Sequence, residues 1–176
     1  MKDKVERVLF DEATLKKRIE TMGHSLDLLY KDEEDLLVIS LLKGSFIFAA
    51  DLIRSMQTKL EVDFMITSSY EDQEKTSGEV KLVKDFSSRI KDRNVLVVDD
   101  IVDSGRTMKF VLEHLKKENP KSLRSCVLLD KPSRREVDID ADMVGFEIED
   151  LFVVGYGLNY GDYYRNVPYV FTYKRS

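Results

Sequence analysis

Two adjacent carboxylates and a short polar loop follow one strongly apolar stretch of the sequence. Val95–Val98 is a run of branched apolar residues, typical of a strand buried on both faces of a parallel sheet. Asp99 and Asp100 come next, so the pattern predicts that the strand ends there. Carboxylates at the end of a parallel strand can accept hydrogen bonds from sugar hydroxyls or bind a hard divalent cation.

The loop after these acids has the composition of an anion site. Ser104 and Thr107 offer hydroxyls, and Gly105 allows the backbone to close around a ligand. An apolar pattern from Phe110 to Leu115 predicts a helix, whose N-terminus favours a phosphate. One ligand that satisfies both the acids and the loop is a ribose 5-phosphate that carries further phosphate and a magnesium ion. The simpler alternative is an ordinary turn whose polar residues only cap the helix.

The whole run resembles the phosphoribosyl-pyrophosphate (PRPP) motif of the type I phosphoribosyltransferases. The shared pattern is a hydrophobic strand, two acids, two apolar residues and then Asp-Ser-Gly-x-Thr. The resemblance implies that Asp99 and Asp100 bind Mg²⁺ and that Asp103 is the general base near purine N7. It also implies contacts with PRPP or its 5-phosphate from nine consecutive residues: Asp99, Asp100, Ile101, Val102, Asp103, Ser104, Gly105, Arg106 and Thr107.

Length and composition restrict the class of protein. A chain of 176 residues with 43% hydrophobic residues predicts one globular domain, residues 1–176. The net charge of −5 argues against a nucleic-acid surface. The single Cys126 excludes an internal disulfide. We find no signal peptide and no run of roughly 20 apolar residues, so we expect a cytoplasmic protein without membrane contact.

The elements that would position these residues alternate between strands and helices. Asp11 is a candidate N-cap for a helix with an apolar stripe at Leu15, Ile19, Met22, Leu26 and Leu29. We expect strands over 36–42, 62–68, 95–98 and 123–129, a returning strand from Val80, and a helix with Phe46, Ala49, Ala50 and Ile53 inward. This order predicts an α/β fold with a central, mostly parallel sheet flanked by helices.

Several further segments match the hypoxanthine-guanine branch of the family. On pattern alone Lys43, Lys131 and Arg165 would be solvated surface cations. The resemblance implies instead that Lys43, Gly44 and Arg165 contact pyrophosphate, and that the loop of Lys43 and Gly44 often has a cis peptide. It implies that Lys131 binds the purine 6-oxo group, that Phe152 stacks on the base, and that Val153 and Asn159 also lie at the base.

A polar segment between two predicted strands has two interpretations. Residues 71–77 show no periodicity and could form a solvated hairpin tip. The resemblance implies a flexible flap, at approximately 70–85, that closes over the site and carries the pair Ser69-Tyr70. It also implies a small hood formed by the C-terminal segment.

Two residues depart from the family pattern. Asp99 stands where Glu is common, and Asn159 stands where Asp is usual. An amide keeps an oxygen ligand but loses the negative charge, which predicts weaker binding of a second metal ion.

The resemblance implies a purine salvage enzyme, a homodimer or homotetramer that transfers 5-phosphoribosyl from PRPP to hypoxanthine or guanine. The products would be IMP or GMP and pyrophosphate. Two alternatives remain open at this stage. One is a regulator that retains the PRPP pocket as a sensor, and the other is a relative that prefers xanthine or, less consistently with a lysine donor, adenine.

Overall fold

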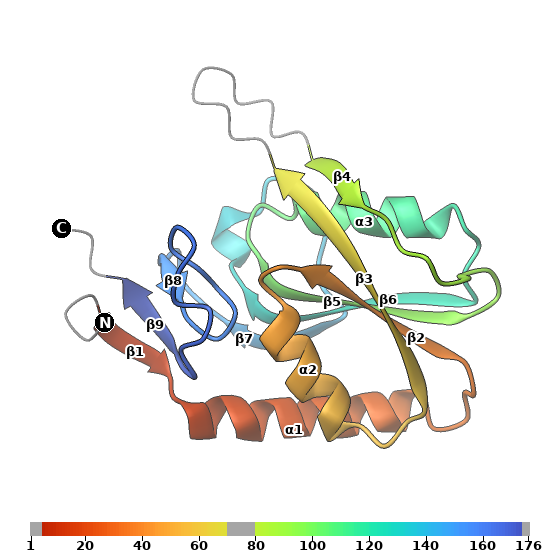
Figure 1. Cartoon of the computed structure of the whole chain (residues 1–176), viewed down its shortest axis with the longest axis horizontal. Helices are drawn as coiled ribbons and strands as arrows, with labels where there is room; N and C mark the ends of the chain where they lie inside the picture. The colour runs from red at the N-terminus through yellow and green to blue at the C-terminus, as the bar shows by residue number, and fades with distance from the viewer. Residues whose placement is uncertain (1–4, 70–79, 174–176) are drawn as a thin grey trace.

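The computed structural model describes residues 5–69 and 80–173, which form two β-sheets and three α-helices (Figure 1). In the larger sheet the strand order is β4-β3-β2-β5-β6-β7. All its neighbouring strands are parallel except β4, which is antiparallel to β3. The expected α/β architecture is therefore confirmed. The strands are β2 (Leu36–Leu42), β3 (Leu60–Ser69), β4 (Val80–Lys84), β5 (Asn94–Val102), β6 (Ser122–Asp130) and β7 (Met143–Glu147).

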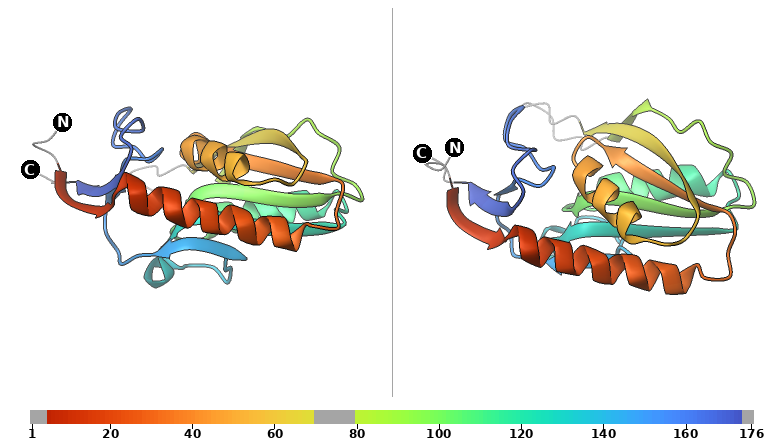
Figure 2. Two further views of the ribbon diagram at one scale, coloured as in Figure 1. Left: turned by 90° about the horizontal axis from the view of Figure 1, so that it is seen from below. Right: turned by 60° about the horizontal axis from the view of Figure 1, so that its bottom comes forward.

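Helices cover both faces of the larger sheet (Figure 2). On one face α1 (Glu12–Leu29) and α2 (Phe46–Ser55) bury their apolar residues against strand residues such as Val38 and Leu96. On the other face α3 (Arg106–Lys116) packs against residues such as Ile39 and Val97. Successive residues of β2 and β5 therefore belong alternately to two cores, which explains why these strands read as continuous apolar runs.

The first helix begins as the sequence predicts. The side chain of Asp11 caps α1, because its Oδ1 accepts a hydrogen bond from the backbone N of Thr14 at 2.8 Å. Four residues of the predicted stripe are buried, but the prediction for Leu29 is wrong, since it is 44% exposed. In α2 the predicted inward position of Phe46 is also wrong. There Phe48 and Leu52 are buried instead, because the helix presents a different side to the sheet.

Two strands differ from their sequence patterns. The prediction that the central strand ends before Asp99 is wrong, because β5 continues to Val102 and pairs with β6 over its whole length. In β3 the aromatic side chain of Phe64 is 40% exposed, whereas the neighbouring Asp63 is only 6% exposed. In β3, therefore, the polar Asp63 faces inward and the apolar Phe64 faces outward.

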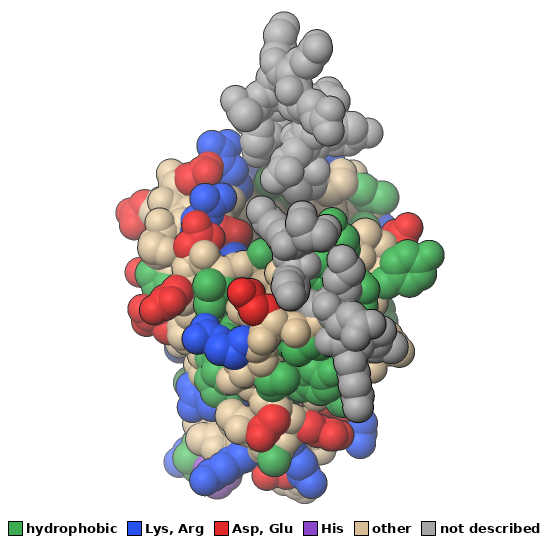
Figure 3. Space-filling model, turned by 90° about the vertical axis from the view of Figure 1, so that its left-hand side faces the viewer, with side chains coloured by type: hydrophobic (Ala, Val, Ile, Leu, Met, Phe, Trp, Pro, Cys, Tyr) green, Lys and Arg blue, Asp and Glu red, His purple; other side chains and the backbone are tan. Residues whose placement is uncertain are grey.

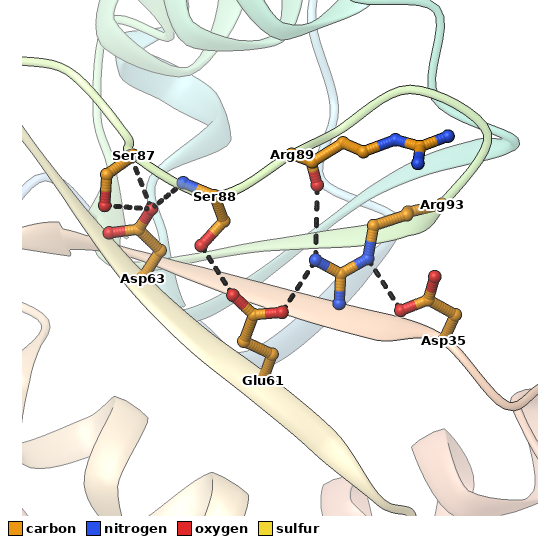
Figure 4. Close-up of polar contacts among 7 residues, drawn as sticks. All are labelled: Asp35, Glu61, Asp63, Ser87, Ser88, Arg89 and Arg93. Atoms are coloured by element: carbon orange, nitrogen blue, oxygen red, sulfur yellow. Dashed lines mark hydrogen bonds and ion pairs between the residues drawn. The ribbon is translucent and has the colours of Figure 1, made fainter.

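A polar network accounts for the burial of Asp63 (Figure 4). Its Oδ2 accepts hydrogen bonds from the backbone N of Ser87 and of Ser88 at 2.6 and 2.8 Å. Beside it, the guanidinium of Arg93 donates to Glu61 at 2.8 Å and to Asp35 at 2.7 Å. These contacts attach the connection between β4 and β5 to β3 and to Asp35, the residue just before β2.

A smaller antiparallel sheet stands at the end of the larger one, in the order β1-β9-β8. It joins β1 (Val5–Phe10) to β8 (Val153–Val154) and β9 (Val170–Tyr173), so the first and last of the described strands lie side by side. Neither β1 nor β9 is predicted from the sequence. In the part of the chain that the structure describes, no helix is long and apolar enough to cross a membrane.

Candidate active site

Three adjacent parallel strands bring the predicted chemical groups to one edge of the sheet. Lys43 follows β2, the acids Asp99 and Asp100 lie near the end of β5, and Lys131 follows β6. Since these strands are neighbours and point the same way, their carboxyl ends meet. The register places residues that are far apart in the sequence at a single site.

The acid pair is deeply placed and electrostatically destabilised. Asp99 is 8% exposed, and its Oδ1 accepts a hydrogen bond from the backbone N of Asp100 at 2.9 Å. Burial, followed by the neighbouring charge of Asp100, raises the pKa of Asp99 well above its usual range. Burial also raises the pKa of Asp100, against the lowering effect of hydrogen bonds and of the positive charge of Arg165. A hard cation beside the pair would relieve this repulsion, so the donor set fits a divalent metal.

The protein supplies only part of a coordination shell at this point. Among residues 5–69 and 80–173, no group of three or more His, Cys, Asp or Glu side chains is arranged to hold a metal ion by itself. A cation bound by the acid pair would need further oxygen ligands from water or from a bound phosphate.

The loop after β5 has the geometry of an anion cradle. Gly105 has a φ of 82° and precedes the first residue of α3. A Cβ at this position would lie 2.5 Å from Cγ2 of Ile139, so glycine is required for both conformation and space. Ser104 and Thr107 are partly exposed beside it. Not every predicted contact residue offers its side chain here, since Val102 is 3% exposed and belongs to the core.

Four charged side chains alternate in sign beside this loop. Nζ of Lys131 lies 3.6 Å from Oδ2 of Asp103 and 3.9 Å from Oδ1 of Asp150. Nε of Arg134 lies 3.2 Å from Oδ1 of Asp103, and its Nη1 lies 3.7 Å from Oδ2 of Asp150. Lys131 is only 6% exposed, so its charge needs these anions nearby. Neither Arg134 nor Asp150 is predicted from the sequence as a site residue.

The segment 43–44 is held against both the acid pair and the C-terminal segment. The peptide bond between Leu42 and Lys43 is cis. A Cβ on Gly157 would lie 2.1 Å from the carbonyl oxygen of Gly44, so the two backbones touch closely. Nη1 of Arg165 donates to the carbonyl oxygen of Gly157 at 2.7 Å. The structure therefore brings Lys43, Gly44 and Arg165 into one region, as predicted.

The predicted base-binding segment presents one aromatic ring to solvent and buries the next residues. Phe152 is 38% exposed and packs edge-on against Tyr160, with ring centroids 5.8 Å apart. Val153 is 6% exposed, so only its backbone can contact a ligand. The side-chain amide of Asn159 donates to the carbonyl of Gly161.

Tyr156 connects this segment to α2, a link that the sequence does not predict. Its hydroxyl donates a hydrogen bond to Asp51. Burial, and then this hydrogen bond, raise the pKa of Tyr156. Among the predicted flap residues, Ser69 ends β3, whereas Tyr70 and residues 71–79 lie outside the described residues.

The side of the molecule that carries the small sheet is mixed in charge (Figure 3). Basic and acidic side chains lie next to one another there and do not form a broad patch of one sign.

Comparisons with known proteins show which family this chain is similar to. A family model described as a phosphoribosyl transferase domain matches residues 9–161. The hypoxanthine phosphoribosyltransferase of Salmonella typhimurium is 49% identical over 171 residues, which cover 97% of this chain and 96% of the relative. The hypoxanthine-guanine phosphoribosyltransferase of Bacillus subtilis is 45% identical over 170 residues, 97% of this chain and 94% of the relative.

Solved structures show the same similarity. A hypoxanthine phosphoribosyltransferase from Staphylococcus aureus has a TM-score of 0.94 at 41% identity, covering 99% of this chain and 94% of the other. A hypoxanthine-guanine phosphoribosyltransferase from Bacillus anthracis has a TM-score of 0.89 at 40% identity, covering 97% of this chain and 98% of the other.

Proposed function

The chain belongs to the hypoxanthine(-guanine) phosphoribosyltransferases, and from this premise we propose how its own residues carry out the reaction. It is a purine salvage enzyme that transfers 5-phosphoribosyl from PRPP to hypoxanthine or guanine and forms IMP or GMP and pyrophosphate. The observation that supports the residue roles is the meeting of the acid pair, the glycine loop and Lys131 at the carboxyl ends of adjacent strands.

The loop from Asp103 to Thr107 anchors the 5-phosphate through its amides and hydroxyls and through the N-terminus of α3. This binding aligns C1 of the ribose with the base, so that the reaction benefits from proximity. As the bond from C1 to pyrophosphate breaks, the sugar gains oxocarbenium character and the leaving group gains negative charge. Lys43 and Arg165 neutralise that charge.

Asp99 and Asp100 would hold Mg²⁺, and Asn159 could add an amide oxygen. When bound, the ion supplies positive charge next to the pyrophosphate. The raised pKa of Asp99 supports this role, because burial and the adjacent charge of Asp100 disfavour its carboxylate and a bound cation would offset both.

The purine lies between Phe152 and the charged cluster. Phe152 stacks on its face, the backbone of Val153 contacts its edge, and Lys131 donates to its 6-oxo group. Asp103 accepts a proton at N7, and general acid–base help of this kind contributes roughly 10²- to 10⁴-fold. A lysine donor is matched to an oxo group and mismatched to the amino group of adenine.

The proposal extends to the organisation of the whole chain. We infer one domain, with the small sheet of β1, β8 and β9 as a hood and the segment 70–85 as a flap, in a cytoplasmic enzyme. We infer assembly as a homodimer or homotetramer from the resemblance to the family, and Phe46, Phe64 and Val83 are exposed apolar side chains available for such an interface. Analytical ultracentrifugation measures this assembly directly.

Steady-state rates with hypoxanthine, guanine, xanthine and adenine, each with PRPP and Mg²⁺, test the function. We expect nucleotide and pyrophosphate with at least one of hypoxanthine and guanine, and the lowest kcat/KM with adenine. Tight PRPP binding without any nucleotide product would replace the enzyme with a PRPP sensor.

A further inference from the structure

The charged cluster beside the loop gives each of its members two partners of opposite sign. Two cations, Lys131 and Arg134, alternate with two anions, Asp103 and Asp150, at the distances given above. The two contacts of Lys131, at 3.6 and 3.9 Å, are longer than hydrogen bonds. In contrast, Arg134 makes a hydrogen bond to Asp103 at 3.2 Å. Lys131 is therefore held by charge alone, and its ammonium keeps donors for a third partner.

We propose that Arg134 and Asp150 are positioning residues, which act on the reaction through Asp103 and Lys131. Arg134 holds the carboxylate of Asp103 and keeps a cation beside it when Lys131 turns to the purine. Asp150 holds the ammonium of Lys131 on the side of the cluster that faces the purine. This inference rests on the proposed function, in which Asp103 accepts a proton and Lys131 binds the 6-oxo group.

Backbone contacts support the alignment of the two segments. The backbone N of Lys131 donates to the carbonyl of Val102 at 2.9 Å, and the backbone N of Arg134 donates to the carbonyl of Lys131 at 3.0 Å. Arg134 ends the short 3-10 helix η2 (Pro132–Arg134). The position of Arg134 opposite Asp103 is thus set by hydrogen bonds of the main chain and does not depend on a long free side chain alone.

The charged groups around Asp103 show what Arg134 contributes when Lys131 binds the purine. Lys131 and Arg134, which follow β6 in the chain, lie beside the carboxylate of Asp103. Asp150 contacts both of these cations. Arg135 also contacts Asp103, but its Nη1 donates to the backbone carbonyl of that residue at 2.8 Å and its Nη2 donates to Asp130. Once Lys131 turns to the purine, Arg134 is the remaining cation that these contacts place at the carboxylate. The Asp103 carboxylate, through its hydrogen bond and its charge, raises the pKa of Arg134.

The test compares Arg134→Gln and Asp150→Asn with the wild-type enzyme. For Arg134→Gln we expect the acid limb of the kcat profile to move to higher pH by about one unit, because an ionised carboxylate loses a cation. Its KM for PRPP stays unchanged. For Asp150→Asn we expect the KM for hypoxanthine to rise about three- to tenfold, with little change in kcat, and Asp150→Glu to restore it to within about twofold.

Arg89→Gln and Asp92→Asn are matched controls, because this pair is exposed and its closest atoms are 4.0 Å apart. A merely structural role would lower Tm without changing the pH profile of kcat or the KM for hypoxanthine. If the variants fold and keep the wild-type pH profile and the wild-type KM for hypoxanthine, the inference is overturned.

A second readout does not depend on turnover. At fixed pH 7, the ¹³C-carboxyl chemical shift of Asp103, assigned with Asp103→Asn, should change in Arg134→Gln and stay unchanged in Arg89→Gln. If the wild-type protein made no nucleotide, the proposed function would fail, while this chemical shift would still support or refute the contact between Arg134 and Asp103.

Discussion

Gly44 and Asp100 are in such close contact that a Cβ atom on Gly44 would lie 1.8 Å from Oδ2 of Asp100. The loop that we assign to pyrophosphate and the acid that we assign to the metal therefore share one packed contact. Asp100 has limited freedom to move away, because its Oδ1 accepts a hydrogen bond from the backbone N of Ile101 at 2.9 Å. Only glycine fits at position 44 without displacing the carboxylate.

Gly44→Ala should therefore impair PRPP use. We expect kcat/KM for PRPP to fall more than about tenfold, since displacing Asp100 disturbs a group that binds ligand; tenfold corresponds to about 1.4 kcal/mol. Gly161→Ala is the control, because a Cβ there meets no atom within 4 Å although φ is +57°. That variant should lose about 1 kcal/mol of stability and keep the wild-type KM for PRPP. Equal KM values in both variants would contradict the prediction.

Asp103→Asn separates a chemical role from a structural one. The amide keeps the shape of the loop but cannot accept the proton from the purine. We expect kcat to fall by about 10²- to 10⁴-fold while the Kd for IMP changes little, measured by isothermal titration. Loss of IMP binding together with kcat would show instead that Asp103 only shapes the loop.

Asn159→Asp restores the carboxylate that is usual in the family. We expect half-saturation at a lower Mg²⁺ concentration in initial-rate measurements at fixed PRPP, because a carboxylate binds a hard cation more strongly than an amide does. The hydrogen bond from the Asn159 amide to Gly161 is lost, at a cost of about 0.5–1.5 kcal/mol of stability. Asn159→Ala, which also loses that bond, should not lower the Mg²⁺ requirement. An unchanged requirement in Asn159→Asp would place this side chain outside the metal's surroundings.

Asp63 makes the stability of the protein depend on pH. Burial alone would raise its pKa, but hydrogen bonds from the backbone N of Ser87, Ser88 and Phe64 outweigh burial and lower the pKa to about 2. A pKa that is lower in the folded state stabilises the fold above the ordinary pKa of 3.8. This contribution, about 2 kcal/mol, is lost as the pH falls from about 5 towards 2.

Urea unfolding of Asp63→Asn checks this linkage. The variant should be about 2 kcal/mol less stable than wild type at pH 7, and the difference should shrink as the pH approaches 2, because protonated Asp63 also loses its charge. Asp32→Asn is the control, since that side chain is 85% exposed. A stability difference that stays constant from pH 7 to pH 3 would show that Asp63 acts only through its shape.

The α/β order and the chemistry of the central motif could be predicted from local sequence. The apolar run before Asp99, the small residues of the loop and the N-cap Asp11 each report on neighbouring residues, and such short-range patterns determine strands, turns and helix starts. Tertiary structure decided the rest. Pairing with β6 extends β5 past the acids, and backbone hydrogen bonds from 87–88 bury Asp63 while Phe64 faces outward.

By itself, the sequence determined that one strand, its acids and its loop could bind a phosphorylated sugar, because those groups are contiguous. Only the fold decided what surrounds them. The link between Tyr156 and Asp51, the contact of Gly44 with Asp100, and the ring that joins Asp103 and Lys131 to Arg134 and Asp150 all unite distant segments. The parallel register brings the ends of β2, β5, β6 and β7 together, which accounts for the last two, and the packing of the C-terminal segment against α2 accounts for the first. Neither cause leaves a periodic trace in the chain.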